Sequence, residues 1–227
     1  MRSPYIYIGP NLKHPPIEIR ELECVRDHTP LFSKLSFKAE AGTITQIGGE
    51  NGSGKTSLLR ILTGLAPAES GEVLWHGEPI EKKRADYAAA QTFIGHLPGI
   101  KAQLSPLENL NWLAPAASQS YYFDALSEVG LRGYEDSPSY TLSAGQKRRV
   151  ALARLYLENR QVWILDEPFT AIDKAGVAKL ESLLVKHAKN GGIVILTTHH
   201  ELKVDAQRFR QIMLGRSFKE GASVDHG

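Results

Sequence analysis

The segment that most constrains the local fold of this chain is residues 49–56, which read Gly-Glu-Asn-Gly-Ser-Gly-Lys-Thr. The spacing is G-x-x-x-x-G-K-[ST], in which glycines let backbone N–H groups curl around an anion at a helix N-terminus. A β-prone run, 43–47, precedes the loop and an apolar helical run, 57–62, follows it, as the motif requires. The loop predicts a site for nucleotide phosphates, with Lys55 reaching the β- and γ-phosphates and Thr56 ligating Mg²⁺. A glycine-rich turn without a ligand is the alternative.

A second signal is the apolar run 162–165, which ends in Asp166 and Glu167. A buried strand delivers such acids to the carboxyl edge of an open α/β sheet, where ligands bind. In that setting Asp166 would hold Mg²⁺, and Glu167 would orient and polarise an attacking water. Taken alone, the pair would equally suit a solvated turn.

A third signal is a capping box, Ser143-x-x-Gln146, followed by a basic helical run from 147. The box predicts a helix start. Because Ser143 and Gly145 open this helix, its N-terminus is a candidate second anion site, although an ordinary capped basic helix would look the same.

The rest of the chain alternates between strand and helix patterns. We expect strands at 17–22, 31–37, 43–47, 72–77, 91–95, 162–165, 193–196 and 210–214. Helices are expected at 57–62, within 106–133 with a break at Pro115, after Ser143, at 174–189, and as a short helix from about 201. Strands apolar on both faces and separated by helices predict a parallel sheet covered on both sides. The early strands predict an antiparallel β lobe, residues 100–145 a helical insert, and residues 1–16 an extension ahead of a domain spanning 17–227.

Composition excludes several classes of function. The formal net charge of +2 over 227 residues is too small to argue for nucleic acid as a partner. Cys24 is the single cysteine, so an intramolecular disulfide and a Cys-x-x-Cys site are both impossible. No apolar run approaches the roughly 20 residues of a membrane-spanning helix, and residues 1–9 do not read as a secretory signal.

In this order the motifs resemble those of ATP-binding cassette (ABC) ATPases, over about residues 17–215. Residues 142–146, Leu-Ser-Ala-Gly-Gln, resemble the family signature with Ala144 in place of a glycine. Residues 170–173 resemble its D-loop, which ends here at Asp173, and residues 197–199 resemble the segment that ends in its switch histidine, here His199.

The resemblance implies an α/β P-loop ABC ATPase domain with a parallel core sheet, an antiparallel β lobe and a helical subdomain. It implies ATP and Mg²⁺ as cofactors, with Lys55, Glu167 and His199 as catalytic residues and Thr56 and Asp166 as metal ligands. It also implies that the signature end of one copy closes on the ATP held by another copy. The expected nucleotide-binding residues are Gly49, Glu50, Asn51, Gly52, Ser53, Gly54, Lys55, Thr56, Ser57, Ser143, Ala144, Gly145, Gln146 and Asp173.

Two positions depart from the family pattern. Gly99 stands where the family has a glutamine that contacts Mg²⁺ and senses the membrane partner, so coupling is expected to rest on packing by Leu97, Ile100 and Leu104. Arg26 stands where an aromatic residue usually stacks on adenine. Arg26 would then lie over the base as a planar cation, or the adenine would be held loosely.

These departures, with residues 71–75, 94–101, 163–173 and 192–199, resemble the ATP-binding subunits of cytochrome c maturation (haem export) systems. That resemblance implies that the protein is held on the cytoplasmic face of a bacterial inner membrane by integral membrane subunits. It also implies that ATP hydrolysis releases a haem-loaded chaperone. No direct haem site is expected, because His14, His28, His76 and His96 look like surface residues. His199 and His200 should point apart and share no metal, with His200 at an exposed helix start.

Two alternatives remain open. One is the ATPase subunit of another ABC exporter or importer. The other is a soluble nucleotide-gated ABC clamp with little turnover, suggested by Gly99 and opposed by Glu167 and His199.

Overall fold

A computed structural model of the chain describes residues 15–115, 119–157 and 159–215. The predicted extension, 1–16, lies outside the described residues apart from Pro15 and Pro16. In the described ranges no helix is both long and apolar enough to cross a membrane.

An antiparallel sheet forms from the early strands, as predicted. Its strands are β1 (Ile17–Arg26), β2 (Thr29–Ala39), β4 (Ser70–Trp75) and β5 (Glu78–Pro79), in the order β2-β1-β4-β5. β1 and β2 form a hairpin whose two turn residues, Asp27 and His28, have φ of 48° and 60°. Positive φ at both positions is typical of the type I′ turn, which suits the twist of a two-residue hairpin.

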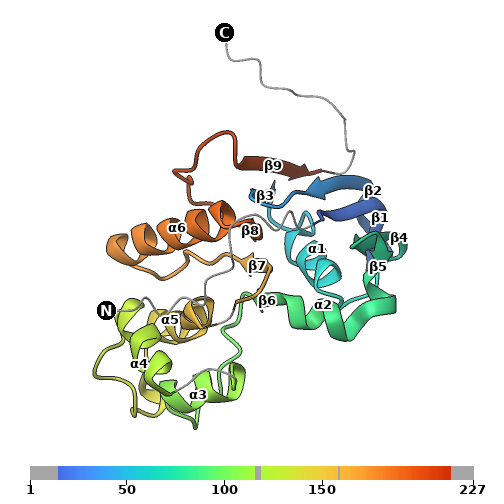
Figure 1. Ribbon diagram of the computed structural model, residues 1–227. Helices are drawn as coiled ribbons and strands as arrows, with labels where there is room; N and C mark the ends of the chain where they lie inside the picture. The colour runs from blue at the N-terminus through green and yellow to red at the C-terminus, as the bar shows by residue number, and fades with distance from the viewer. Residues whose placement is uncertain (1–14, 116–118, 158, 216–227) are drawn as a thin grey trace.

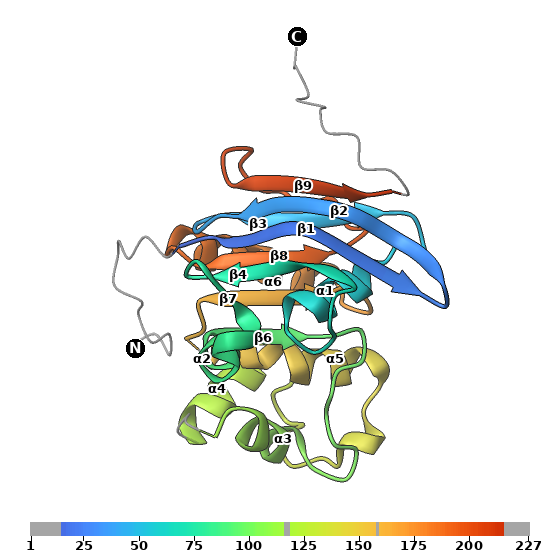
Figure 2. The same ribbon diagram turned by 90° about the vertical axis from the view of Figure 1, so that its right-hand side faces the viewer.

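A parallel sheet forms the second layer, also as predicted. It contains β3 (Ile44–Gly49), β6 (Gln91–Ile94), β7 (Val162–Asp166), β8 (Ile193–Thr197) and β9 (Phe209–Leu214). The order is β6-β7-β8-β3-β9 and every pair is parallel, which Figure 2 shows from β6 at the bottom to β9 at the top. The carboxyl ends of β3, β7 and β8 therefore meet at one edge.

Both faces of this sheet are buried. On β7, Val162 and Ile164 pack toward α1 (Lys55–Leu62) and the antiparallel sheet, and β8 alternates in the same way. Trp163 and Leu165 pack on the opposite face, in a cluster with α5 (Ala144–Ala153) and α6 (Lys174–Lys189). Helix α1 thus lies between the two sheets, which explains why the central strands read as continuous apolar runs.

The predicted helical insert contains α3 (Pro106–Leu113) and α4 (Gln119–Glu128), with Pro115 between them. These helices contact α5 and form a separate group at the lower left of Figure 1, away from the antiparallel sheet. Short helical pieces complete the described chain: η1 (Ile80–Lys83), α2 (Arg84–Ala90), η2 (Ser139–Thr141) and η3 (Arg154–Tyr156). The sequence did not predict η1 and α2.

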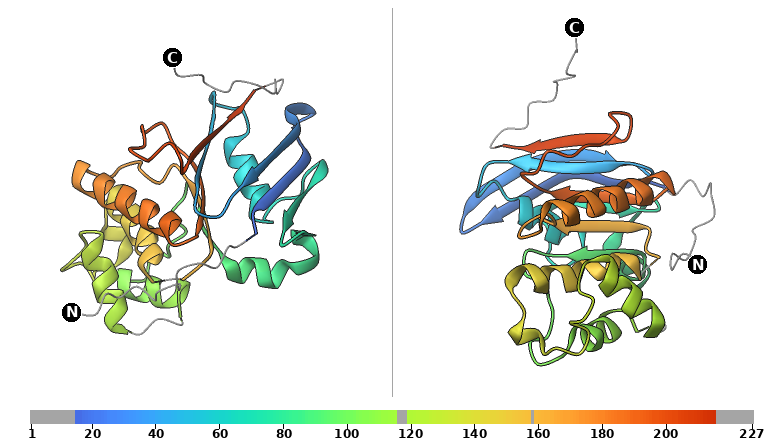
Figure 3. Two further views of the ribbon diagram at one scale, coloured as in Figure 1. Left: turned by 45° about the horizontal axis from the view of Figure 1, so that its top comes forward. Right: turned by 90° about the vertical axis from the view of Figure 1, so that its left-hand side faces the viewer.

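The predicted short helix from about 201 is wrong. Residues 201–205 have no regular structure, and a turn follows at 206–208 before β9 (Figure 3). Leu202 and Val204 are half-buried against the core while residues 201, 203 and 205 are exposed. This period of two suits a non-helical segment, since a helix would turn one of the two apolar side chains away from the core.

Candidate functional site

The phosphate loop connects β3 to α1 as the motif requires. Gly54 sits at the N-cap of α1 with φ of 97°, in the left-handed region where glycine is favoured. A Cβ on Gly49 would lie 2.6 Å from Ser53 Oγ and 2.8 Å from Leu214 O, so a larger residue does not fit there. Helix α1 has no side-chain cap, which leaves its first N–H groups to a ligand or water.

Polar groups of the loop suit an anion. Lys55 Nζ donates to Gly49 O at 2.7 Å and Glu50 O at 3.0 Å, so the ammonium is folded over the loop. Ser53 Oγ is buried and has no hydrogen-bond partner among the described residues. An orphaned buried hydroxyl beside a cation and a helix N-terminus fits the phosphate groups of a nucleotide.

Hard oxygen ligands gather where β7 meets α1. Thr56 Oγ1 donates to Asp166 Oδ2 at 2.9 Å, and Thr197 Oγ1, from the end of β8, donates to Asp166 Oδ1 at 2.7 Å. A hydroxyl and one carboxylate match the donor set of Mg²⁺, which takes its other ligands from phosphate and water. The described residues hold no group of three or more His, Cys, Asp and Glu side chains suited to a metal.

Glu167 is held in a strained backbone conformation at this edge. Its φ is 49°, and its N–H donates to Thr197 O at 3.1 Å and Thr197 Oγ1 at 2.9 Å. A non-glycine residue with positive φ costs about 1 kcal/mol or more, which surrounding contacts must offset. His199 Nε2 lies 3.6 Å from Glu167 Oε1, so both side chains face the same space.

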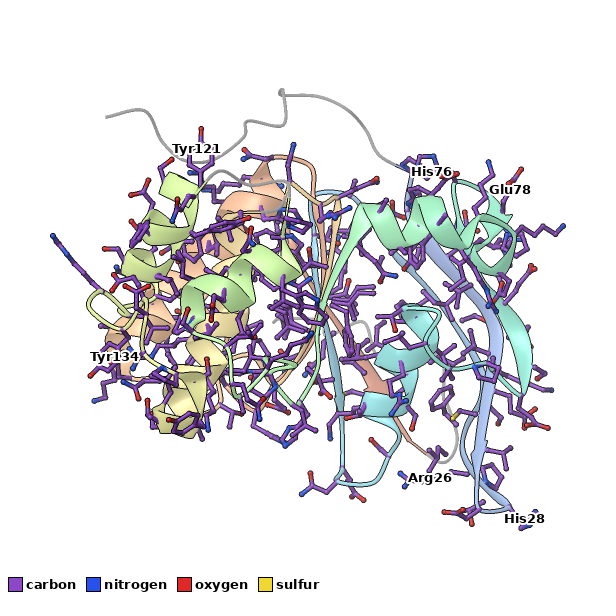
Figure 4. The ribbon with its side chains drawn as sticks, turned by 90° about the horizontal axis from the view of Figure 1, so that it is seen from below. Arg26, His28, His76, Glu78, Tyr121 and Tyr134 are labelled. Carbon is purple, nitrogen blue, oxygen red and sulfur yellow. The ribbon has the colours of Figure 1, made fainter. Side chains whose placement is uncertain are left out.

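One cleft of about 670 Å³, the size of an ordinary small-molecule site, is lined by Lys55, Thr56, Asp166, Glu167 and His199. The β1–β2 hairpin forms its opposite wall with Arg26, Asp27, Thr29 and Leu31. Figure 4 shows Arg26 near the end of this hairpin. Among the described lining residues there is no Phe, Tyr or Trp. The Arg26 side chain is largely exposed, and within the described part of the chain its ion pair is a loose one, 3.7 Å to Asp27.

The helix N-terminus that the sequence offered as a second anion site lies outside this cleft. Ser143 Oγ accepts from Gln146 N at 3.2 Å and Gln146 Oε1 accepts from Ser143 N at 2.8 Å, which confirms the capping box. A Cβ on Gly145 would lie 2.5 Å from Ala171 O, so α5 packs tightly against the loop before α6. Asp173 caps α6 through Gly176 N at 2.7 Å. In the described structure none of these residues lines the cleft.

The histidines are only partly as expected. His28, His76 and His96 are exposed, with His28 and His76 at opposite ends of the antiparallel sheet in Figure 4; His14 lies outside the described residues. His199 and His200 do point to different partners. His200 is half-buried, however, with Nε2 3.0 Å from Glu181 Oε1 and its ring on Phe169, because no helix starts here to expose it.

Two further residues were missed from the sequence. Thr197 Oγ1 donates a hydrogen bond to Asp166 Oδ1 and accepts one from the backbone N–H of Glu167. Arg148 lies in a basic run typical of an exposed helix, yet it is buried. The position of Thr197 at a buried strand end was a usable signal; Arg148 gave none, because its burial depends on tertiary packing.

A glycine-rich loop, a Thr–Asp pair and a glutamate, all at one edge of a parallel sheet, define a P-loop nucleoside triphosphatase. The ABC transporter family model matches residues 32–170, more than half of the chain, and the chain belongs to this family of ATPases.

Relatives are similar over most of their length. The cytochrome c biogenesis ATP-binding export protein CcmA of Tatumella citrea is 54% identical over 87% of this chain and 95% of that protein. The protein of the same name from Escherichia coli K12 is 52% identical over 87% and 96%. A solved structure, a putative ABC transporter ATP-binding protein from Pyrococcus furiosus, matches with a TM-score of 0.74 and 27% identity, covering 88% of this chain and 97% of that one.

Proposed function

We propose that this chain is the ATP-hydrolysing subunit of a membrane ABC complex for cytochrome c biogenesis, acting in haem export or the release of a haem-loaded chaperone. The observation that carries the proposal is the 52–54% identity to cytochrome c biogenesis ATP-binding export proteins over nearly their whole length. Its place would be the cytoplasmic face of a bacterial inner membrane, held there by integral membrane subunits. The domain would span 17–227, with its helical subdomain at about 100–145.

The geometry supports ATP as the nucleotide substrate in the cleft. Lys55 and the N-terminus of α1 would bind the β- and γ-phosphates, and Arg26 would contact the base. Thr56 and Asp166 would hold Mg²⁺, which neutralises charge on the phosphates when bound.

Glu167 and His199 would act on the attacking water. Glu167 lines the cleft and its backbone N–H is bonded to Thr197, so its carboxylate would orient a water and accept its proton. His199, on the same side of the cleft, would contact the γ-phosphate end. Because phosphoryl transfer depends chiefly on positioning and electrostatics, small errors in these positions should be costly.

A second copy of the chain would complete the site. Residues 143–146 form a capped, exposed helix N-terminus that does not reach its own cleft, so this end is available to the ATP of a partner copy. Asp173, at the start of α6, would lie at the same seam.

Genetic replacement and co-purification test the proposal together. A bacterium that lacks its own cytochrome c biogenesis ATPase is given this chain or its Lys55→Ala variant, and haem-containing c-type cytochromes are measured. The native chain should restore them and should co-purify from membranes with the cytochrome c biogenesis subunits, whereas Lys55→Ala should co-purify without restoring them. Failure to co-purify with those subunits, or association with another transporter instead, would contradict the proposal.

A further inference from the structure

Arg148 is a buried charge that the proposed mechanism does not use. It lies on α5, five residues after the capping Ser143, and only 4% of its surface is exposed. A buried guanidinium is costly unless its donors are satisfied and its charge is balanced. The contacts around Arg148 show how its two terminal nitrogens are satisfied and its charge is balanced.

The Arg148 fork joins three segments of the chain. Nη1 donates to Gly95 O at 2.5 Å and to His96 O at 3.4 Å, in the segment that follows β6. Nη2 donates to Asp166 O at 2.5 Å, at the end of β7. One side chain therefore connects the helix of the signature motif with two strand ends of the parallel sheet.

Asp166 O belongs to the peptide group that links Asp166 to Glu167. The carbonyl of this peptide accepts from Arg148, and its N–H, on Glu167, donates to Thr197. The peptide plane is thus held on one side by α5 and on the other by β8. The backbone rotation that directly follows this peptide is the φ of Glu167, which is 49°. The orientation of the peptide plane therefore sets the direction of the Glu167 carboxylate.

Charge balance agrees with this role. Burial lowers the pKa of the Arg148 guanidinium, and the nearby carboxylates of Asp166 and Glu167 oppose that shift. Arginine stays protonated in proteins, so a fixed positive charge lies beside the two acids. Nε of Arg148 is buried without a hydrogen-bond partner in the described residues, so the terminal nitrogens carry the connection.

We propose that Arg148 is a positioning residue that ties α5 to the Asp166–Glu167 peptide and so holds the Glu167 carboxylate in place to orient the attacking water. The inference rests on the proposed ATP hydrolysis at this cleft. It also links the two nucleotide-binding ends of the chain, because the helix whose N-terminus would meet the partner copy's ATP is bonded directly to the catalytic edge.

The neighbouring Arg149 offers a matched control. It lies on the same helix and carries the same charge, but its Nη1 donates to Val129 O at 3.4 Å and Gly130 O at 3.3 Å, within the helical part of the molecule. Arg149→Gln therefore removes an arginine from α5 without touching the Asp166–Glu167 peptide.

The experiment compares full-length Arg148→Gln, Arg148→Lys and Arg149→Gln with the native chain. The measurements are kcat for ATP hydrolysis, Kd for ATP without Mg²⁺ (to prevent turnover), and Tm. Arg148→Gln should lower kcat about 10- to 100-fold, as misplaced catalytic groups do, with Kd within about threefold of native. Arg148→Lys should be intermediate, because one ammonium keeps the charge but cannot match the planar fork. Arg149→Gln should stay within about twofold in kcat.

Two results would overturn the inference: a kcat of Arg148→Gln equal to that of Arg149→Gln, or a loss of ATP affinity as large as the loss of kcat. If Arg148→Gln does not fold, the same comparison of kcat and Kd with Arg149→Gln is made for Arg148→Lys, which keeps the buried charge. Absence of ATP turnover in the native chain together with its membrane partner would instead refute the proposed function, so the two failures are distinguishable.

Discussion

Lys55 is the cation that the phosphate loop presents to a ligand. Removing it in Lys55→Ala should lower ATP turnover by about 10³-fold or more, roughly 4 kcal/mol of barrier, because its charge stabilises the transferring phosphoryl group. ATPase assays on the purified membrane complex measure this effect. Activity within tenfold of the native complex would refute the phosphate-loop assignment.

Arg26 is the residue through which the cleft would contact the base. If the guanidinium stacks on adenine at this exposed site, Arg26→Ala should raise the Kd for ATP by about two- to fivefold and leave kcat unchanged. Arg20→Ala on the same strand is the control, because Arg20 pairs with Glu18 at 2.8 Å and does not line the cleft. Equal ATP affinity in Arg26→Ala and the native chain would show that the base is held by other groups.

Motif spacing predicted the residues that lie near one another in sequence or belong to a known pattern. The phosphate loop, the Thr56–Asp166 pair and the Ser143 capping box all took the expected geometry. Arg148 and His200 were not predicted, because their partners are set by which strand and helix lie beside them in the folded chain.

At the level of elements, strands apolar on both faces were the most reliable signal. β7 and β8 are fully buried, as their continuous apolar runs predicted for strands of a parallel sheet covered on both faces. A short helix was predicted from about 201, in the connection from β8 to β9, but residues 201–205 have no regular structure, and Leu202 and Val204 are half-buried with a period of two. Too few residues lie between the turns there for helix and strand periods to be separated reliably.

The loop after β6 carries the unusual Gly99. Its φ is 68° and a Cβ there would meet nothing within 4 Å, so a side chain has room but is strained. Gly99→Gln should cost about 1 kcal/mol of stability and leave basal ATPase within a few-fold of the native value. A Tm measurement and an ATPase assay check both parts; a loss of activity greater than tenfold would show that this glycine is needed for turnover.

Leu97, in the same loop, is a better position than Ile100 at which to test contact with the membrane partner. It is 79% exposed, whereas Ile100 packs against the core, so a charge at Ile100 would test folding instead of docking. Leu97→Asp should reduce partner binding in a pull-down and abolish partner stimulation of ATPase, because it places a charge in an apolar contact. Gly99→Gln is the control from the same loop. If Leu97→Asp binds the partner and its ATPase is stimulated as strongly as that of the native chain, the coupling surface lies elsewhere.

In the whole molecule, the phosphate-loop cleft and the capped end of α5, which we propose meets a partner copy's nucleotide, face different places. The cleft holds the phosphate loop, Asp166 and Glu167, while the capped N-terminus of α5 is exposed outside it. A single copy therefore leaves one end of its site open. We therefore propose that two copies close around ATP before hydrolysis, with the signature end of each on the nucleotide of the other.

Glu167→Gln tests this requirement most directly, because it keeps the shape of the side chain and removes only the carboxylate that positions water. Light scattering measures the mass of the purified variant with and without ATP and Mg²⁺. Hydrolysis should fall while ATP still binds, so the mass should double when ATP is added and return when ATP is removed. A variant that binds ATP yet stays at the mass of one chain, in solution and by crosslinking in the membrane complex, would contradict the account.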